Sequence, residues 1–516
     1  MRSTRRGGGV GGVDSVRGGR HAGAGGGWRG GRRPGGRLMR RRMVWVGLAV
    51  LAVSCASPPE RTKVAELPVR DQWAAGAPAG TVPEGPWWEA LGGTNLAALV
   101  EEALAHNHDL RQAAARVEAA VAQARAAGAA LQPQLSFGGD AGRRQQVFVG
   151  LPIPGREGVP LVSRSTSYGA SLNLSWELDL WGRIRAGQSA ALADLQASEA
   201  AWRGARNSLA AQTARAWLAL VAANHQCKLA RATRDNLART AERIEARYRQ
   251  GLRPALDHRM ALNNLAVAEG LVAARERERE AAIRQLEILL GRYPAGELDA
   301  RAPLPEVGEE IPAGLPSDLL ERRPDLVAAE RQLAASLTRV KEAKRALLPR
   351  ISLTASGGRT SNQLEDLLDS SFNMWTLAAN LTQPLLQGGR LRANVRLARA
   401  RAREALENYV SVVLRAFGEV ETALVAEQKL REREAALAES VRHAREAWQL
   451  AEERYQAGLI DFVTLMETQR AVYTAESDWI QARRQRLDNR IDLYLALGGG
   501  FGSETAAEAE NVASKD

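Results

Sequence analysis

Histidine and cysteine are the side chains best suited to acid–base, nucleophilic or metal chemistry, and this chain has few of them. Its six histidines are scattered through 516 residues, at positions 21, 106, 108, 225, 258 and 443. His106 and His108 are two residues apart and cannot share one face of a helix. No glycine-rich loop is placed to bind phosphate, and the carboxylates fall in charge-alternating runs typical of solvated helices. We therefore expect no enzyme, no metal site and no non-covalent cofactor.

Cys55 is the one residue whose surroundings predict a specific modification. Three arginines at 40–42 precede an uncharged apolar run at 43–53, which fits a secretory signal and is too short to span a bilayer as a helix. The ending LAVSC at 51–55 resembles a bacterial lipobox, in which the cysteine is lipidated and becomes the new N-terminus. We expect a lipoprotein signal peptide at 39–54 and a covalent lipid on Cys55. An ordinary signal peptide with an incidental cysteine is the alternative.

The net charge of +11 belongs to the N-terminal leader. Residues 1–42 hold twelve arginines and one acidic residue, whereas the rest of the chain has 58 basic and 58 acidic residues. A neutral body gives no indication of a nucleic-acid partner. Residues 1–38 also hold 15 of the 48 glycines. This Arg/Gly-rich leader is either a disordered segment, which could bind RNA without folding, or the product of a start codon assigned too early.

Neither a disulfide nor a transmembrane helix is expected in the mature chain. Cys227, the only other cysteine, lies in a helical stretch and is expected to be a small buried apolar residue. No stretch after residue 55 approaches the roughly 18 apolar residues that a membrane-spanning helix needs. If the chain crosses a membrane, it must do so as a closed β-barrel.

The sequence contains an internal duplication. Two pairs of strings align at a shift of 207 residues: LSWELDLWGRIR at 174–185 with LTQPLLQGGRLR at 381–392, and RYRQGL at 247–252 with RYQAGL at 454–459. The segments that precede these strings align at a shift of 216 residues. We interpret 94–300 and 301–498 as two repeats of one pseudo-symmetric domain. An extended segment at 55–93 precedes them, and a disordered tail is expected at 499–516.

Each repeat contains two segments in which apolar and polar residues alternate, which is typical of strands with one apolar face. We expect strands at about 133–143, 167–179, 349–358 and 374–383, with a long hairpin loop at about 144–166. Four strands are too few to close a barrel, because the smallest membrane barrels have about eight; three chains would supply about twelve. A small soluble sheet is the alternative.

Long helices follow the strand pairs. The segments 183–249 and 390–456 are each 67 residues without proline, or about 100 Å of helix. A heptad pattern in the second indicates coiled-coil packing: Leu406, Tyr409, Val413, Ala416, Val420 and Ala423. Gly251 and Gly458 are placed to end the long helices, and returning helices are expected at 254–291 and 461–497.

Several strings resemble the outer membrane efflux protein (TolC-like) family, in its lipoprotein branch serving resistance–nodulation–division pumps (NodT/OprM-like). They are Trp87-Trp88 before the first helix, WELDLWGR at 176–183, RRPDLVAAE at 322–330, LPRISLTAS at 348–356 and RYQAGLIDFVTLMETQR at 454–470. The resemblance spans about residues 86–498. One departure is Thr94-Asn95, where the family often has Asp-Pro at the start of the first helix.

The resemblance implies an α+β membrane protein that forms a homotrimer in the cell outer membrane, surrounded by lipid and lipid-anchored on the periplasmic side. Four transmembrane β-strands per chain would build a barrel of about twelve strands, continued by a long periplasmic α-helical coiled-coil barrel. It also implies a passive duct for drugs or other small molecules. The duct would dock on a periplasmic membrane-fusion adaptor and an inner-membrane resistance–nodulation–division pump.

In this family the tips of the helical hairpins contact the adaptor. The residues that match are Arg247, Gly251 and Leu252 in the first repeat and Arg454, Gly458 and Leu459 in the second. Glycine permits a tight turn and the close approach of another backbone. The alternative is a helix cap that the leucine closes, with no role in docking.

Relatives close the periplasmic end of the tunnel with rings of aspartate and apolar side chains, and Asp461 matches the acidic position. Three copies near a threefold axis would repel one another and favour cations, so we predict Asp461 at the periplasmic aperture gate. A helix N-cap is an equally open alternative. Asp257 is a second, weaker candidate for the same region.

The joint between the second strand and the first long helix carries further candidates. Asp179 and Arg183 are predicted to pair there, and Glu177 and Asp179, on the polar phase of the strand, to face the lumen or its rim. Trp176 and Trp181 are predicted either at the membrane interface or in simple core packing.

Two other functions stay open from the sequence. One is the outer-membrane duct of an ABC-driven (type I) protein secretion system, which differs in cargo rather than in physics. The other is a soluble periplasmic coiled-coil scaffold, against which the alternating strands argue. The six methionines do not cluster, so a dedicated copper or silver duct is disfavoured.

Overall fold

The computed structural model describes residues 56–61, 70–76, 85–148, 160–298, 302–308 and 311–499. The predicted leader, signal peptide and Cys55 lie outside the described residues, as does the predicted tail after Gly499.

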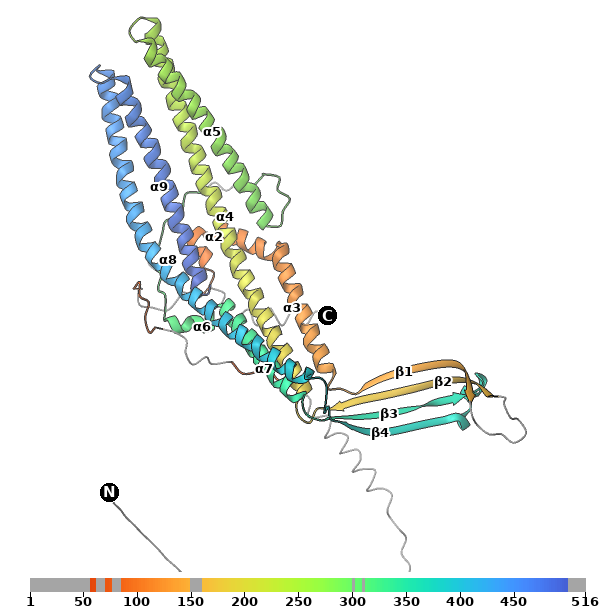
Figure 1. Cartoon of the computed structure of the whole chain (residues 1–516). Coiled ribbons are helices and arrows are strands. Elements are labelled where there is room, and N and C mark those ends of the chain that lie inside the picture. The colour runs from red at the N-terminus through yellow and green to blue at the C-terminus, as the bar shows by residue number, and fades with distance from the viewer. Residues whose placement is uncertain are drawn as a thin grey trace, which may run out of the picture. The chain divides into compact units, whose positions relative to one another are not determined.

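Four antiparallel strands form one sheet in the order β1-β2-β3-β4 (Figure 1). They are β1 (Gln134–Phe148), β2 (Leu161–Leu178), β3 (Arg350–Ser361) and β4 (Asn373–Thr382). The central pairing of β2 with β3 joins the two repeats, for example Leu174 with Ala355. Each repeat thus contributes one hairpin, and β1 and β4 form the two edges.

The first hairpin is longer than the alternation predicted. Instead of strands at 133–143 and 167–179, the ladder continues until Phe148 pairs with Leu161. Arg143, Arg144, Gln145 and Gln146 are all polar, so side-chain alternation stops there. Backbone hydrogen bonding does not depend on that alternation, and the strands continue through part of the expected loop.

Large apolar side chains of the sheet remain exposed in the single chain. Examples are Phe137 at 74 %, Trp375 at 80 % and Leu377 at 73 % exposure. The sheet therefore presents apolar surface that the described elements of its own chain do not cover.

Each strand pair is followed by a helical hairpin (Figure 1). In the first repeat α4 (Arg183–Arg249) returns as α5 (Ala255–Leu289), and in the second α8 (Arg390–Gln456) returns as α9 (Phe462–Ala496). The long helices have 67 residues each and the returning helices 35 each. The bounds of α4 and α8 coincide with the expected ones. Among the described residues, no helix is both long and apolar enough to cross a membrane.

Shorter helices lead into each strand pair. They are α2 (Trp87–His106) and α3 (His108–Ala129) in the first repeat, and α6 (Leu319–Arg322) and α7 (Pro324–Arg345) in the second. Short 3-10 turns lie at Pro316–Asp318, Glu365–Leu368 and Ser370–Phe372. The sequence predicts Trp87 and Trp88 before the first helix. They lie in a short helical segment at the start of α2, and α2 kinks after them at Gly93 (φ 60°, ψ −154°).

The main core forms where both repeats meet. The indole of Trp87 stacks on Tyr494 of α9 at 5.3 Å between ring centroids, and Trp217 of α4 is buried in the same cluster. In α8 the heptad positions Val413, Ala416 and Val420 are fully buried. The predicted coiled-coil stripe is therefore the packing face of this helix.

Residues 56–61 and 70–76 form an extended segment that we call the N-terminal strap. Ser189 of α4 donates its hydroxyl to the Ser57 carbonyl at 2.7 Å, and Arg331 of α7 donates to the Pro59 carbonyl at 2.8 Å. Further along, the backbone N–H groups of Ala74 and Ala75 donate to the Glu421 carboxylate of α8 at 2.7 and 2.8 Å. The strap thus contacts helices of both repeats.

Candidate functional site at the hairpin tips

The tip of the first hairpin is built on a left-handed glycine. Gly251 has φ +75°, a conformation that costs a residue with a side chain. Its N–H donates to the Tyr248 carbonyl, and the Leu252 N–H donates to the Arg247 carbonyl, both at 2.9 Å. These two bonds satisfy carbonyls that the end of α4 would otherwise leave unpaired.

The second hairpin repeats this geometry. Gly458 has φ +77°, its N–H donates to the Tyr455 carbonyl at 3.1 Å, and the Leu459 N–H donates to the Arg454 carbonyl at 2.9 Å. The duplicated RY–GL strings therefore encode two equivalent helix stops. Helix capping explains why glycine occurs at both tips and why the carbonyl groups of Arg247 and Arg454 are hydrogen-bonded.

The tip leucines keep most of their apolar side-chain surface exposed. Leu252 is 68 % and Leu459 is 74 % exposed, so each leucine closes its helix through its backbone N–H while most of its side chain stays uncovered. Leu256 beside the first tip is 66 % exposed as well. Exposed leucines at the ends of two rigid hairpins leave apolar area available to a partner.

Asp461 is the N-cap of α9. Its Oδ1 accepts the Thr464 backbone N–H at 2.8 Å, and hydrogen bonds from the Thr464 side chain and backbone lower the pKa of Asp461 below its ordinary value. The carboxylate is exposed and ionised at neutral pH. Asp461 therefore acts as a helix cap and also remains a charged surface group. Its predicted role in an aperture gate is compatible with this geometry and stays a prediction.

Asp257 does not lie at an open surface. Its side chain is 14 % exposed and faces Arg253 at 3.8 Å. The Arg253 guanidinium in turn lies 4.7 Å from the centre of the Tyr455 ring on the other hairpin. This cation–π contact, which sequence patterns did not indicate, joins the two tips.

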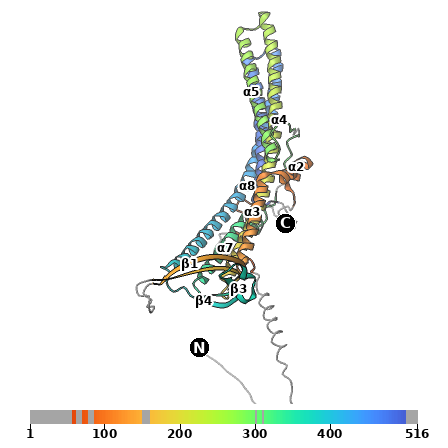
Figure 2. The same cartoon turned by 90° about the vertical axis from the view of Figure 1, so that its right-hand side faces the viewer.

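A second, smaller core lies between the hairpins just behind the tips. Ile244 of α4, Tyr455 of α8 and Phe462 of α9 are almost fully buried there. A cavity of about 240 Å³ adjoins this core, with Arg243, Trp448 and Gln469 among its lining residues. Figure 2 shows the two hairpins extending together away from the sheet.

At the strand-to-helix joint the predicted pairing of Asp179 with Arg183 is wrong. The Asp179 carboxylate accepts the backbone N–H groups of Ile184 and Arg185 at 3.0 and 2.8 Å, and Arg183 pairs with Glu177 at 2.9 Å. Gly182, at φ +74°, turns the chain so that Asp179 faces the N-terminus of α4. Its side chain is only 6 % exposed, so it caps a helix instead of facing a lumen.

The joint tryptophans differ from each other. Trp176 is half-buried and donates to the Leu131 carbonyl at 2.9 Å. Trp181 donates to the Pro349 carbonyl at 2.7 Å and is 47 % exposed. A hydrogen bond within the chain therefore holds Trp176 at the joint, whereas Trp181 retains the exposed surface of an interface residue, and both predicted roles stay open.

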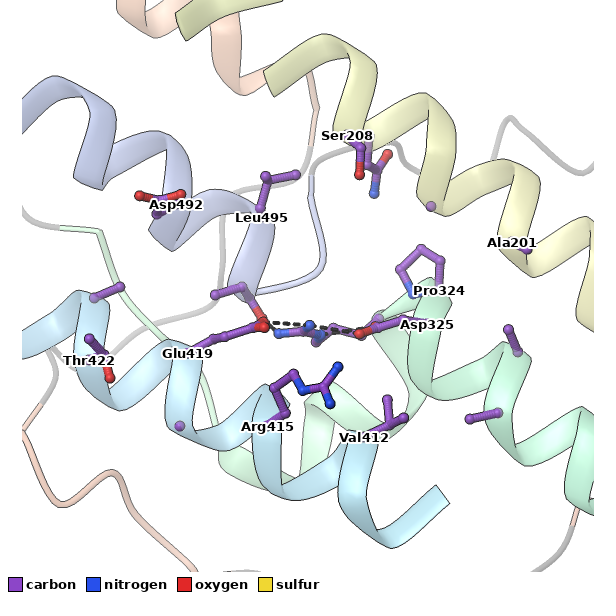
Figure 3. Close-up of a pocket in the computed structure, with 18 of the residues that line it drawn as sticks. Ala201, Ser208, Pro324, Asp325, Val412, Arg415, Glu419, Thr422, Asp492 and Leu495 are labelled. Carbon is purple, nitrogen blue, oxygen red and sulfur yellow. Dashed lines mark hydrogen bonds and ion pairs between the residues drawn. The ribbon is translucent and has the colours of Figure 1, made fainter. Parts of the chain in front are cut away.

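Sequence patterns also missed a cavity of about 1150 Å³ where α4, α7, α8 and α9 converge (Figure 3). Arg323 is one of its lining residues and makes ion pairs of 2.7 Å with both Asp325 and Glu419. Arg415 points toward this cluster from α8 (Figure 3). The only sequence signal was the string RRPDL at 322–326, which by itself indicates no cavity. Among the residues that the structure describes, no group of three side chains is arranged to hold a metal ion.

Comparison with known proteins places this geometry among export channels. The chain matches the family described as "Outer membrane efflux protein" over residues 99–292 and 315–499. It is 33 % identical to the pyoverdine export outer membrane protein OpmQ of Pseudomonas putida, over 90 % of this chain and 98 % of that protein. It is 31 % identical to the toluene efflux pump outer membrane protein TtgI of the same species, over 79 % and 85 %.

A solved structure is similar along its whole length. The crystal structure of the open state of the Neisseria gonorrhoeae MtrE outer membrane channel superposes with a TM-score of 0.75 at 30 % identity, covering 86 % of this chain and 98 % of that one. The sheet, the hairpins and their order are therefore shared with a channel and not with a soluble scaffold.

Proposed function

This chain belongs to the outer membrane efflux protein family, and we propose that it is the outer-membrane duct of a tripartite system that exports small organic molecules. The observation that carries the proposal is the match along nearly the whole chain to export channels of the outer membrane. Pyoverdine and toluene appear in the names of two relatives. These compounds differ so much that the shared architecture supports only the broad class of cargo.

We infer that the working unit is a homotrimer. Both edge strands of the sheet, β1 and β4, lack a second partner among the described residues, and an unpaired edge invites pairing with another chain. Three copies would supply about twelve strands, enough to enclose a channel. The exposed apolar face of the sheet supports contact with lipid.

The partners we propose are a periplasmic membrane-fusion adaptor and an inner-membrane resistance–nodulation–division pump. The exposed Leu252 and Leu459 on capped, rigid tips support adaptor docking. A channel of this family conducts its cargo without converting it, so the energy for export has to come from the pump.

The protein lies in the outer membrane, and we propose that Cys55 carries a lipid there. Ser57 and Pro59, which follow Cys55 closely, are hydrogen-bonded to α4 and α7. Ser189, the donor to Ser57, is only six residues beyond the start of α4 at Arg183, and β2 ends at Leu178. A lipid on Cys55 would therefore begin near the end of the sheet, where acyl chains can enter the bilayer.

Site-directed cross-linking from the tip tests the docking proposal. Leu459→Cys and Leu252→Cys are introduced separately into a Cys227→Ala background, and captured proteins are identified by mass spectrometry of native cells. Leu397→Cys serves as the control, because Leu397 is 50 % exposed but lies at the sheet end of α8. We expect the tip variants, and not the control, to capture an adaptor of a resistance–nodulation–division pump.

Other outcomes would redirect the proposal. Capture of the adaptor of an ABC transporter would assign the chain to type I protein secretion. Capture of no periplasmic partner from either tip would show that the tip assignment is wrong.

A further inference from the structure

The first four turns of α8 carry four arginines in one line, which we call the arginine stripe: Arg392, Arg396, Arg399 and Arg403. All four side chains are exposed. Within the described part of the chain none of them makes an ion pair or a hydrogen bond. Their spacings of three and four residues place like charges next to one another, which destabilises a helix that has no anionic partner.

The stripe lies on the flank of α8 that the N-terminal strap contacts farther along the helix. Phe417 and Glu421 follow Arg403 by about four and five helical turns, so they share its face. The Trp73 ring of the strap lies 6.1 Å from the Phe417 ring, edge to face. The Ala74 N–H donates to Glu421 at 2.7 Å. The strap therefore identifies the side of α8 to which the arginines point.

That side is the outer surface of the duct if Cys55 carries a lipid, an argument that rests on the proposed function. The strap begins at Ala56, next to Cys55. Acyl chains on Cys55 can reach the bilayer only from outside the tube. The opposite flank of α8 carries Asn408 and Arg415, which line the cavity of Figure 3, and it would face inward.

If the sheet spans the membrane, the first two arginines of the stripe lie at the depth of lipid headgroups. Leu385 and Leu386, between β4 and α8, are each 91 % exposed. Along α8, which starts at Arg390, Arg392 lies about 3 Å and Arg396 about 9 Å from the first residue. The headgroup layer on one side of a bilayer is about 5–7 Å thick. The order of exposed leucines and then arginines along the chain corresponds to the order of acyl chains and then phosphate groups from the bilayer core outward.

We propose that the arginine stripe binds the phosphate groups of anionic phospholipids in the periplasmic leaflet of the outer membrane. One guanidinium group can donate two parallel hydrogen bonds to two oxygens of one phosphate, a bidentate geometry that lysine cannot reproduce. Arg392 and Arg396 contact the headgroups directly. Arg399 and Arg403 extend the positive field away from the membrane.

Two matched double variants test the proposal. Arg392→Gln/Arg403→Gln removes two charges from the stripe, and Arg390→Gln/Arg401→Gln removes two charges with the same spacing from the opposite face of the same helix. The full-length protein, purified in an uncharged detergent, is titrated with phosphatidylglycerol or phosphatidylcholine, and bound lipid is counted by native mass spectrometry.

We expect the wild type to prefer phosphatidylglycerol, and this preference to fall about fivefold in the stripe variant through the loss of Arg392, with a smaller further loss from Arg403, which lies farther from the headgroups. The opposite-face variant should keep the preference. Equal losses in both variants, or no preference in the wild type, would overturn the proposal. Dissociation of the trimer in the stripe variant with its lipid preference intact would instead assign the stripe to a subunit contact.

Tip cross-linking in the same variants separates this inference from the proposed function. The stripe lies at the opposite end of α8 from Leu459, so capture of the adaptor should be unchanged. If the wild type captures no adaptor but still selects phosphatidylglycerol, docking fails and lipid binding stands. If it captures the adaptor without selecting phosphatidylglycerol, only the lipid inference fails.

Discussion

Asn107 and Arg323 occupy equivalent positions in the two repeats, and each donates a hydrogen bond to the last carbonyl of the returning helix of its own repeat. Asn107 Nδ2 donates to the Leu289 carbonyl at 3.0 Å, and the Arg323 guanidinium donates to the Ala496 carbonyl at 3.1 Å. Leu289 and Ala496 end α5 and α9. Both repeats therefore have the same hydrogen-bonded joint between helices, but the donor is a neutral amide in the first repeat and a charged guanidinium in the second.

The glycine after each returning helix belongs to the same joint. A Cβ on Gly291 would lie 2.8 Å from the His106 carbonyl oxygen, and one on Gly498 would lie 3.3 Å from the Arg322 carbonyl oxygen. Both glycines have positive φ, +74° and +105°. Close backbone approach and a left-handed turn thus require glycine at both places.

We expect the two joints to contribute similarly to stability. Asn107→Ala removes the bond to Leu289 and an N-cap that receives the Asp109 and Leu110 N–H groups, for a loss of about 2 kcal/mol. Arg323→Met removes the bond to Ala496 but leaves Asp325 and Glu419 about half exposed, so that water can solvate them. Its cost should also be about 2 kcal/mol.

Guanidinium-induced unfolding of the detergent-solubilised protein measures both losses. Arg322→Gln, at the exposed neighbouring position, should change the free energy of unfolding by less than about 0.5 kcal/mol. A large loss for Arg323→Met with none for Asn107→Ala would show that the charge network, and not the shared carbonyl bond, holds the joint.

Gly291→Ala should destabilise the chain more than Gly458→Ala. Both residues have φ near +75°, so alanine at either position costs about 1–2 kcal/mol in backbone strain. A Cβ on Gly458 meets no atom within 4 Å, whereas one on Gly291 would lie 2.8 Å from a backbone carbonyl oxygen. Only Gly291→Ala must therefore move the neighbouring backbone. Equal free energies of unfolding for the two variants would contradict this comparison.

Glu287 should make stability fall in acid. Burial alone would raise the pKa of this carboxyl, which is 3 % exposed. Hydrogen bonds from the Gly296, Glu297 and Leu298 backbone N–H groups, helped by Arg284, nonetheless leave the pKa lowered below 4.5. A lowered folded-state pKa means that the contribution is complete above about pH 4.5 and is lost as the pH falls through the lower value.

Unfolding measured from pH 7 downward tests this sign. Glu287→Gln should be less stable than the wild type at neutral pH, and the difference should shrink below about pH 4.5. Glu276→Gln is the control, because Glu276 is a half-exposed surface carboxylate paired with Arg231. A difference between wild type and Glu287→Gln that grows on acidification would refute the assignment.

Asp461→Asn separates the two roles open to this residue. Asparagine caps a helix about as well as aspartate but carries no charge, so α9 should stay intact. If Asp461 lines the periplasmic aperture, the variant should lower the preference for cations, measured as a smaller reversal potential across planar bilayers in a KCl gradient. Asp461→Ala, which loses both cap and charge, serves as the comparison. An unchanged reversal potential for Asp461→Asn would leave Asp461 a helix cap only.

The sequence alone determined the features that depend on local patterns. The duplication, the 67-residue helices and the glycine-ended tips were all predicted from spacing, because periodicity and helix-stop chemistry act within a few residues along the chain. The strand alternation predicted one apolar face, but it missed the extension to Phe148, where backbone pairing continues without a side-chain pattern.

Only the tertiary structure decided which side chains meet across the chain. Asp179 and Arg183 are four residues apart, yet the turn at Gly182 gives them different partners. Asn107 and Leu289 are 182 residues apart, and Arg323 and Ala496 are 173 apart. The same holds for Arg253 over the Tyr455 ring and for the strap on Glu421. Such contacts depend on how whole helices pack against one another, and no local pattern carries that information.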